Sequence, residues 1–391
     1  MTADPSPPAV IAVAPRDPLA PGTFSGYSAR LFGSMRRHGI EVQPLASRRL
    51  RWWDLPAALN LAGLARGRVS GRYAPRIRPD WYWSRAGFER FSRRLQTRLV
   101  GLAEAPVLQV GTHVRVGQPG AGAYCVTDCT VVQALEGGEF SISQTSPRVA
   151  DQAVACQHEV FAACAKVFTL SRWAAASVVA DYGIPAERVV VVGAGANLAE
   201  PVERRPDPAR PLLLFVGRDW QQKGGPLLLE AFGLLRGGLP ALRLAVVGCS
   251  PALRDPGVEV VGYLPGGDPD ARRRLADLYA RASCLVLPSR FDCFPNVLLE
   301  AQLAGVPVVT LAGQGRPEAL ADGRTGRLVH QERPEALAAA VQEVLDDERG
   351  PRRMSPAARR LAEERFTWPA VVDRVLAEMG VPAPPHQQVP G

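Results

Sequence analysis

Short apolar runs recur along the chain and alternate with longer segments whose apolar residues have helical spacing. Continuous apolar runs are typical of parallel strands that are buried on both faces, because each face is then covered by helices. This pattern predicts a first series of strands and a second, more regular series. The first series comprises residues 10–14, 41–45, 107–110, 124–127, 167–170 and 189–192, and the second comprises 211–217, 242–248, 258–264, 284–289 and 307–311.

Glycine and proline mark where the predicted elements begin and end. The loop after the first strand contains Pro15, Pro18, Pro21, Gly22 and Gly26, and a helix is expected from there to about residue 38. Further helices are expected at 171–183, from about 225, at about 271–282, from near 295, at about 357–364 and at 368–379. Strands that alternate with helices in this way predict an α/β protein.

The length of 391 residues exceeds that of one typical core, so two domains are expected. A proline-rich, charged segment that begins at Pro201 has the composition of a linker. We predict two Rossmann-like, doubly wound parallel-sheet domains that face a central cleft. Residues 1–200 would form the first domain, 201–210 the linker and 211–365 the second domain. Residues 366–391 would form a C-terminal helix that packs back on the first domain, followed by a tail.

The composition favours a cytoplasmic protein. No apolar run approaches the roughly 20 residues that span a bilayer, and residues 1–8 lack the features of a signal peptide. Seven cysteines without a C-x-x-C pair suit a reducing compartment. Cys156, His158 and Cys164 lie close in sequence but lack zinc spacing, so we interpret them as helix packing and expect no metal site.

Positive charge is concentrated in the first domain. The net charge is +8, and residues 30–98 hold sixteen arginines against four acidic residues, with Trp52, Trp53, Trp81 and Trp83 among them. Tryptophan with arginine suits peripheral contact with an anionic membrane, on its inner face for a cytoplasmic protein. A solvated helical face with core tryptophans explains the same residues, so both interpretations remain open.

Three further motifs do not have the pattern of a cofactor or metal site. Gly193 and Gly195 resemble the start of a dinucleotide fingerprint, but the third glycine position is Leu198. The segment around Lys223 lacks the Walker A spacing. Asp268 and Asp270 form a D-x-D pair, but they stand before a predicted helix, where aspartate commonly caps the helix.

Three segments carry residues suited to a nucleotide-sugar. Arg218 and Lys223 follow the strand 211–217 and precede a helix, and a cation pair beside helix-terminal amides suits a diphosphate. Lys223 is one of only two lysines in the chain. Asp292 and Glu300 are too far apart to flank one glycosidic bond, which suits one carboxylate on a hexose and one on a ribose. A glycine-rich segment from Leu311 carries Gly313 and Gly315 ahead of a helix, although a plain turn explains these glycines almost as well.

These residues, in this order, resemble the retaining glycosyltransferases of family 4, which have the GT-B fold. The resemblance is strong from about 167 to 329 and weaker before that. It implies that Arg218 and Lys223, with Gly217, hold the donor diphosphate, that Asp292 holds the transferred sugar and that Glu300 holds the ribose. It places the nucleobase near Gly262, Tyr263 and Leu264, and the N-terminal glycine loop at Gly22 and Gly26.

The chain departs from the family pattern at two positions. Asp292 stands where the family has glutamate, and Cys293, followed by Phe294, stands where a glycine is usual. Both departures bear on the identity of the sugar. His113 follows a strand at roughly the position of the family's active-site histidine, and a packed or surface histidine is an equally good interpretation.

The resemblance implies transfer of a hexose from a nucleoside-diphosphate sugar to a hydroxyl acceptor, with retention, without metal and without a further cofactor. The frequency of donors in the family favours a UDP-sugar. The acceptor is left open among a lipid, a glycan end and a small natural product, and no nucleic-acid partner is expected. Alternatives are a GT-B sugar phosphorylase, a nucleotide-sugar epimerase and a non-catalytic GT-B binding protein.

Overall fold

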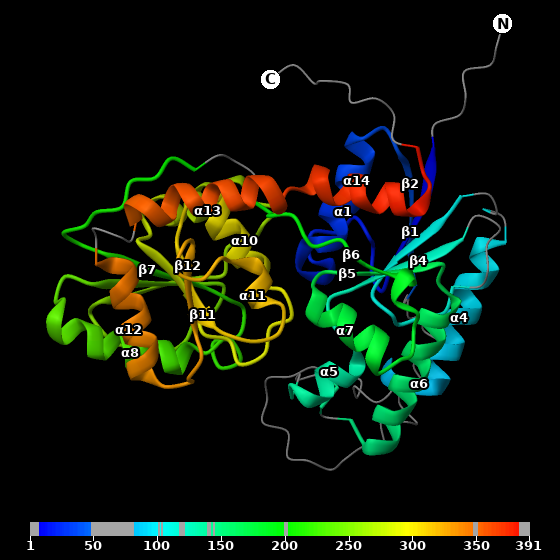
Figure 1. Ribbon diagram of the computed structural model, residues 1–391, viewed down its shortest axis with the longest axis horizontal. Coiled ribbons are helices and arrows are strands. Elements are labelled where there is room, and N and C mark those ends of the chain that lie inside the picture. The colour runs from blue at the N-terminus through cyan, green and yellow to red at the C-terminus, as the bar shows by residue number, and fades with distance from the viewer. Residues whose placement is uncertain are drawn as a thin grey trace, which may run out of the picture. The chain divides into compact units, whose positions relative to one another are not determined.

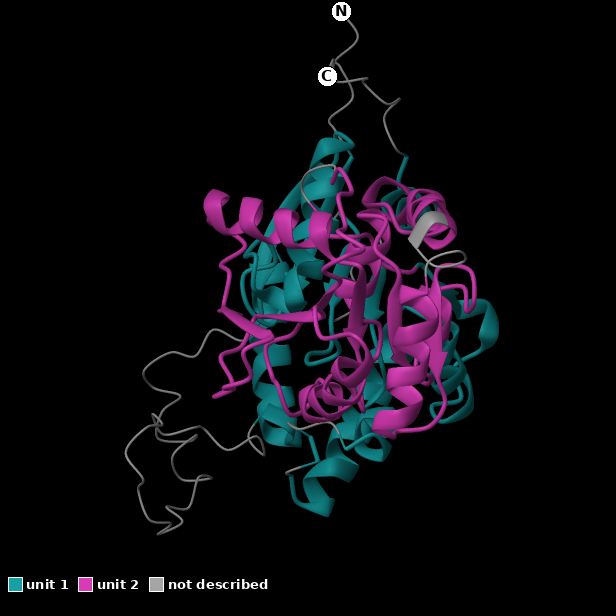
Figure 2. Cartoon of the chain, turned by 90° about the vertical axis from the view of Figure 1, so that its left-hand side faces the viewer, with its two compact units in different colours: residues 1–192, 372–391 teal, residues 193–371 magenta. Residues whose placement is uncertain are grey.

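The computed structural model describes residues 8–47, 82–100, 102, 105–116, 122–138, 142, 143, 145–198, 202–346 and 351–382. The chain divides into two compact units, and Figure 2 colours them separately. Unit 1 comprises 1–192 with 372–391, and unit 2 comprises 193–371. The first boundary therefore lies before the proline-rich segment, and the second lies inside the last helix.

Unit 1 is built on a six-stranded sheet with the order β2-β1-β3-β4-β5-β6, in which neighbouring strands are parallel. The apolar side chains of the four inner strands are almost fully buried, whereas the two edge strands are partly exposed. The strands are β1 (Ala9–Ala14), β2 (Glu41–Ala46), β3 (Val107–Val110), β4 (Ala123–Thr127), β5 (Lys166–Thr169) and β6 (Val189–Val191).

Helices α4 (Arg85–Leu99) and α6 (Pro147–Ala163) cover one face of this sheet. Phe91 and Leu95 of α4 pack on Ile11 and Val107, and α6 packs on Cys125. The remaining elements of the unit are η1 (Thr23–Gly26), α1 (Tyr27–Arg37), α5 (Val131–Glu136), α7 (Arg172–Ala180) and η3 (Ala186–Arg188).

The last helix, α14 (Trp368–Met379), joins unit 1 through its C-terminal part. The Tyr124 hydroxyl donates to the main-chain oxygen of Met379 over 3.3 Å, and Lys166 forms an ion pair with Glu378. Tyr124 lies on the opposite face of β4 from Cys125, because successive side chains of a strand alternate. Residues 372–379 therefore contact the face of the sheet opposite α4 and α6.

Unit 2 repeats the architecture with the order β12-β11-β10-β7-β8-β9, again with parallel neighbours. Its strands are β7 (Leu212–Val216), β8 (Arg243–Val247), β9 (Val258–Gly262), β10 (Cys284–Leu287), β11 (Val308–Leu311) and β12 (Gly326–Val329). Its helices are α8 (Gly225–Gly238), α9 (Pro269–Arg281), α10 (Asn296–Leu303), α11 (Arg316–Ala319), α12 (Pro334–Leu345) and α13 (Pro351–Arg365). Helices α8 and α12 lie side by side, and so do α10 and α13 (Figure 1).

The structure confirms some of the local predictions and contradicts another. Asp268 caps α9 by accepting the main-chain N–H of Asp270, which confirms the capping interpretation. Cys156 and Cys164 are buried in a core cluster, whereas His158 is exposed, so helix packing accounts for this group. Pro295, expected at the first helical position, is instead the N-cap of α10 with extended backbone angles. Within the described residues, no helix combines the length and apolar character that crossing a bilayer requires.

Candidate active site

The strand order of each unit reverses beside its first strand. In unit 2, β7 lies between β10 and β8, and in unit 1, β1 lies between β2 and β3. Open parallel sheets bind ligands outside the carboxyl ends of their strands at such a switch point, because the loops there diverge to opposite faces. In unit 2 the residues expected at the diphosphate follow β7, Asp292 follows β10, and the expected nucleobase segment lies at the end of β9. The candidate site residues of unit 1 follow β1 and β3.

Lys223 and Asp292 meet at the switch point of unit 2. The Lys223 ammonium donates to Oδ2 of Asp292 over 2.6 Å, and the two side chains are 24% and 15% exposed. The sequence analysis assigned these residues separately to the diphosphate and to the sugar. The structure joins them, so the carboxylate of Asp292 balances the charge of Lys223.

Two glycines allow the β7–α8 loop to approach the end of β10. Gly224 has a left-handed backbone with φ +77°, and a Cβ there would lie 1.9 Å from the main-chain oxygen of Pro288. A Cβ on Gly225 would lie 2.1 Å from the Trp220 ring. Only glycine therefore permits the loop to bring Lys223 to Asp292. Sequence reasoning missed both positions, although the dipeptide directly follows the lysine.

Arg218 has a different partner from Lys223. Its guanidinium carbon lies 5.5 Å from the centroid of the Tyr263 ring, a cation–π distance, and Tyr263 is 57% exposed. Gly262 has φ +81° and Leu264 is half-buried, so Tyr263 alone of this expected nucleobase segment projects into solvent. An open pocket of about 490 Å³ adjoins the arginine, lined by Arg218, Asp219, Trp220, Gln221, Pro251, Ala252 and Leu253.

Glu300 is oriented by a tyrosine that the sequence analysis did not identify. The hydroxyl of Tyr279, a fully buried residue of α9, donates to Oε2 of Glu300 over 3.1 Å. Burial, followed by the charge of Glu300, raises the pKa of Tyr279 well above its usual range. The tyrosine is therefore a neutral donor that holds one oxygen of Glu300. In the sequence, Tyr279 lies among apolar residues of a predicted helix, so nothing there indicated that it contacts Glu300.

The two residues that follow Asp292 in its turn are buried. Cys293 and Phe294 are only 8% and 7% exposed. The Phe294 ring packs edge-on against Phe366 at 6.3 Å, and the Cys293 carbonyl accepts the Gly315 N–H over 2.9 Å. These two residues, predicted to bind the donor, would have to do so through main-chain atoms.

Arg316 is another residue to which the sequence analysis assigned no role. It is 1% exposed, and its guanidinium donates to the carbonyl of Gly313 over 3.1 Å and to the Ser289 carbonyl and the Gln314 side chain. The glycine-rich segment is thus more than a plain turn, because this arginine ties it to the end of β10. An arginine beside two glycines is the only trace of this in the sequence.

In unit 1 the expected residues gather around an unusual turn. Phe24 and Ser25 have φ of 49° and 52°, and Gly26 has φ 88°, so three successive residues are left-handed. Such backbone is uncommon outside glycine and concentrates at functional sites. The turn places Phe24 over Gly111, where a Cβ would lie 2.5 Å from the ring.

His113 lies in the same corner of unit 1. Its ring centroid is 6.1 Å from that of Phe24 and 5.4 Å from that of Trp83, and all three side chains are half-buried. Gly22 and Gly26 flank the turn, and Gly22 has open space around its Cα. The structure therefore brings together the residues that follow β1 and β3.

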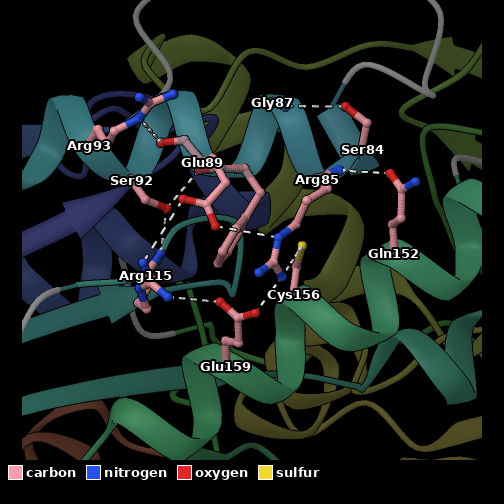
Figure 3. Close-up of polar contacts among 11 residues, drawn as sticks. Ser84, Arg85, Gly87, Glu89, Ser92, Arg93, Arg115, Gln152, Cys156 and Glu159 are labelled. Carbon is pink, nitrogen blue, oxygen red and sulfur yellow. Dashed lines mark hydrogen bonds and ion pairs between the residues drawn. The ribbon is translucent and has the colours of Figure 1, made fainter.

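A polar network holds the segment that carries His113 (Figure 3). Arg115 donates to Glu159 of α6 over 2.9 Å, and Glu159 also pairs with Arg85 of α4. Arg85 and Arg115 both lie near Glu89, at 3.4 and 4.0 Å. Two arginines against two glutamates leave no net charge, so we interpret this cluster as structural.

Solved structures with the same architecture have the GT-B fold. The structure superimposes on sucrose-phosphate synthase from Thermosynechococcus elongatus with a TM-score of 0.68 and 17% identity, over 94% of this chain and 97% of that chain. It also superimposes on Anabaena HepE in complex with UDP-glucose, with a TM-score of 0.62 and 14% identity, over 95% and 99%. WaaG, a glycosyltransferase involved in lipopolysaccharide biosynthesis, gives a TM-score of 0.63 and 17% identity, over 95% and 100%. The chain is a GT-B protein, as the sequence analysis predicted.

Sequence comparison narrows this class for the second unit. Residues 210–347 match the family model described as glycosyl transferases group 1. The chain is 34% identical over 221 residues to a D-inositol 3-phosphate glycosyltransferase from Corynebacterium aurimucosum, covering 50% of this chain and 51% of the relative. A protein of the same name from Streptomyces coelicolor is 32% identical over 251 residues, covering 54% of each. The chain spans about half the length of these curated relatives, and the family model matches residues of unit 2.

Proposed function

We propose that this protein transfers a hexose-type sugar from a nucleoside-diphosphate sugar, preferentially a UDP-sugar, to a hydroxyl acceptor with retention of anomeric configuration. The observation that carries the proposal is the pairing of Lys223 with Asp292 at the switch point of unit 2, inside the segment that matches group 1 glycosyltransferases. HepE, which shares the fold, has been solved with UDP-glucose, which supports a donor of this class.

The residues of unit 2 can divide the work on the donor. Lys223 and Arg218 would stabilise the leaving diphosphate, whose negative charge grows as the glycosidic bond breaks. Asp292 would contact the hexose, and Glu300, held by Tyr279, would accept hydrogen bonds from the ribose hydroxyls. In our proposal the sugar leaves and the acceptor attacks on the same face, and the departing phosphate takes the acceptor's proton.

Donor recognition is tested with a panel of UDP-, GDP-, ADP- and dTDP-sugars. A bound donor raises thermal stability by mass action, so thermal shift identifies the nucleobase and sugar that bind.

Turnover of the best donor is then followed by release of the nucleoside diphosphate, in excess EDTA and with added Mn²⁺. We expect activity to persist in EDTA, because Asp268, half of the D-x-D pair, caps a helix and Asp270 pairs with Arg273. Loss in EDTA with rescue by Mn²⁺ would contradict metal independence.

The acceptor and the stereochemistry are tested on the same donor. The relatives named D-inositol 3-phosphate glycosyltransferase make a phosphorylated cyclitol the first acceptor to try, followed by lipid and glycan acceptors. NMR of the new glycosidic bond should show the anomeric configuration of the donor. Inversion would refute retention. Turnover only with inorganic phosphate would indicate a phosphorylase, isomerised nucleotide-sugar an epimerase, and binding without any turnover a binding protein.

A further inference from the structure

Arg316 is an unusually placed charge. Its side chain is 1% exposed, and the three groups that accept its hydrogen bonds are the Gly313 and Ser289 carbonyls and the Gln314 amide oxygen. All three acceptors are neutral. A buried guanidinium without a hydrogen-bonded carboxylate is costly, because water solvates the charge better than neutral dipoles do. Burial accordingly lowers the pKa of Arg316, and the nearby charge of Asp292 opposes this shift.

The three acceptors belong to two different loops. Ser289 follows β10, and Gly313 and Gln314 follow β11, the neighbouring strand. A further bond joins the same loops, because the Gly315 N–H donates to the Cys293 carbonyl over 2.9 Å. Asp292 precedes Cys293, so its turn is held to the β11–α11 loop on one side and to Lys223 on the other.

The β11–α11 loop needs this support. Gln314 has a left-handed backbone with φ 49°, and Gly313 has φ 131°. A glutamine in this region is strained and persists only where surrounding contacts determine its conformation. The Arg316 guanidinium supplies such contacts, since it binds the carbonyl of residue 313 and the side chain of residue 314.

We infer that Arg316 is a positioning residue for the sugar subsite: its planar guanidinium joins the turn after β10, which carries Asp292, to the turn after β11. That this subsite binds a sugar rests on the proposed function. The positioning role rests on the contacts alone. Arg316 is buried and does not itself touch the donor. Lysine cannot replace it, because a planar guanidinium donates to acceptors in both turns at once, whereas an ammonium is a compact point charge that cannot reach both.

The test compares Arg316→Lys with Arg188→Lys. Arg188 is a matched control, because it also donates to main-chain carbonyls, those of Phe161, Ala162 and Cys164, but it lies in unit 1. Amide hydrogen exchange is measured on the ligand-free full chain. In Arg316→Lys we expect exchange of peptides covering 289–294 and 313–316 to rise by about tenfold or more, as local opening becomes easier. In Arg188→Lys, exchange should rise only around 161–164.

Turnover of the best donor is measured on the same variants. Arg316→Lys should lower kcat by about 10- to 100-fold, the usual cost of a misplaced contact to a reacting group. Affinity for the nucleoside diphosphate, which lacks the sugar, should stay within about threefold. Arg188→Lys should leave both unchanged. If Arg316→Lys does not fold, Gln314→Asn replaces it: asparagine tolerates the left-handed backbone, and its shorter side chain weakens one of the three contacts.

Each outcome has one meaning. Unchanged exchange in the two turns would overturn the positioning role, whether or not the protein transfers sugar. Increased exchange with unchanged kcat, or equal losses of kcat and nucleotide affinity, would overturn the assignment to the sugar subsite. A wild-type chain that binds and turns over no nucleotide-sugar would instead refute the proposed function, and the exchange data would still decide whether Arg316 holds the Asp292 turn.

Discussion

At the scale of single residues, the two cations proposed to bind the diphosphate have different partners in the structure. Lys223 is paired with Asp292, whereas Arg218 lies over the exposed ring of Tyr263. Replacing either with Ala should abolish most transfer while the fold survives, because one charge-assisted contact to an anion is worth about 1.5–3 kcal/mol. The measurement is kcat/KM with the best donor, with Arg188→Ala as control. A double variant with near-normal kcat/KM would remove both residues from the site.

The carboxylates should separate binding from turnover. Glu300→Gln should weaken binding of the nucleoside diphosphate, since a lost polar contact to the ribose costs roughly 1–3 kcal/mol. Asp292→Asn should keep that affinity or increase it, because the change releases Lys223 from its ion pair, and it should lower turnover instead. Calorimetry with the nucleoside diphosphate, alongside transfer rates, checks both. The reverse pattern would exchange the two roles.

At the scale of elements, α9 and α10 are linked by the bond between Tyr279 and Glu300. Because the pKa of Tyr279 is raised in the folded state, its contribution to stability is complete below pH ~10, the ordinary tyrosine value, and is lost as pH rises above it. The melting temperature should therefore fall less steeply between pH 8 and 11 for Tyr279→Phe than for the wild type. Tyr263→Phe, at an exposed position, serves as control, and parallel curves for wild type and Tyr279→Phe would contradict the prediction.

Helices α4 and α6 are linked by the network of Arg85, Arg115, Glu89 and Glu159 (Figure 3). These side chains are 27–43% exposed, so water and salt screen their attraction. A double-mutant cycle on Arg115 and Glu159 should give a coupling free energy of no more than about 1 kcal/mol. Urea unfolding in low and high salt measures it. A coupling of several kcal/mol that persists in high salt would indicate a buried, functional pair instead.

At the scale of the whole molecule, the basic character of residues 30–98 remains to be explained. Trp52, Trp53 and Trp81 lie outside the described residues, and Trp83 packs on a core cluster of unit 1 beside His113. We retain the proposal of peripheral membrane contact and expect the chain to sediment with anionic vesicles and not with neutral ones, since each basic residue near anionic lipid adds ~1 kcal/mol. Replacing Arg48, Arg49 and Arg51 with Glu should reduce the binding. Equal, negligible sedimentation with both vesicles would remove the proposal.

Much of the architecture was readable locally. The apolar runs located eleven of the strands and the last helix closely, because a strand buried on both faces needs consecutive apolar side chains. The sequence analysis did not predict the edge strand β12 or helices α4, α5, α6 and α12. Arginine and other polar residues fill much of α4, and β12 is a four-residue strand inside a glycine-rich segment.

The residues of the site likewise fall into two groups, those recognisable within one segment of sequence and those that only the fold brings together. Lys223, Asp292 and Glu300 could be recognised because each follows a strand or opens a helix, and such positions are visible in a single segment. Their partners could not. Lys223 and Asp292 are 69 residues apart, Tyr279 reaches Glu300 from another helix, and Arg316 reaches back 27 residues to Ser289. These contacts exist because β10 lies between β7 and β11, and that order is set by packing of the whole sheet rather than by any local pattern of residues.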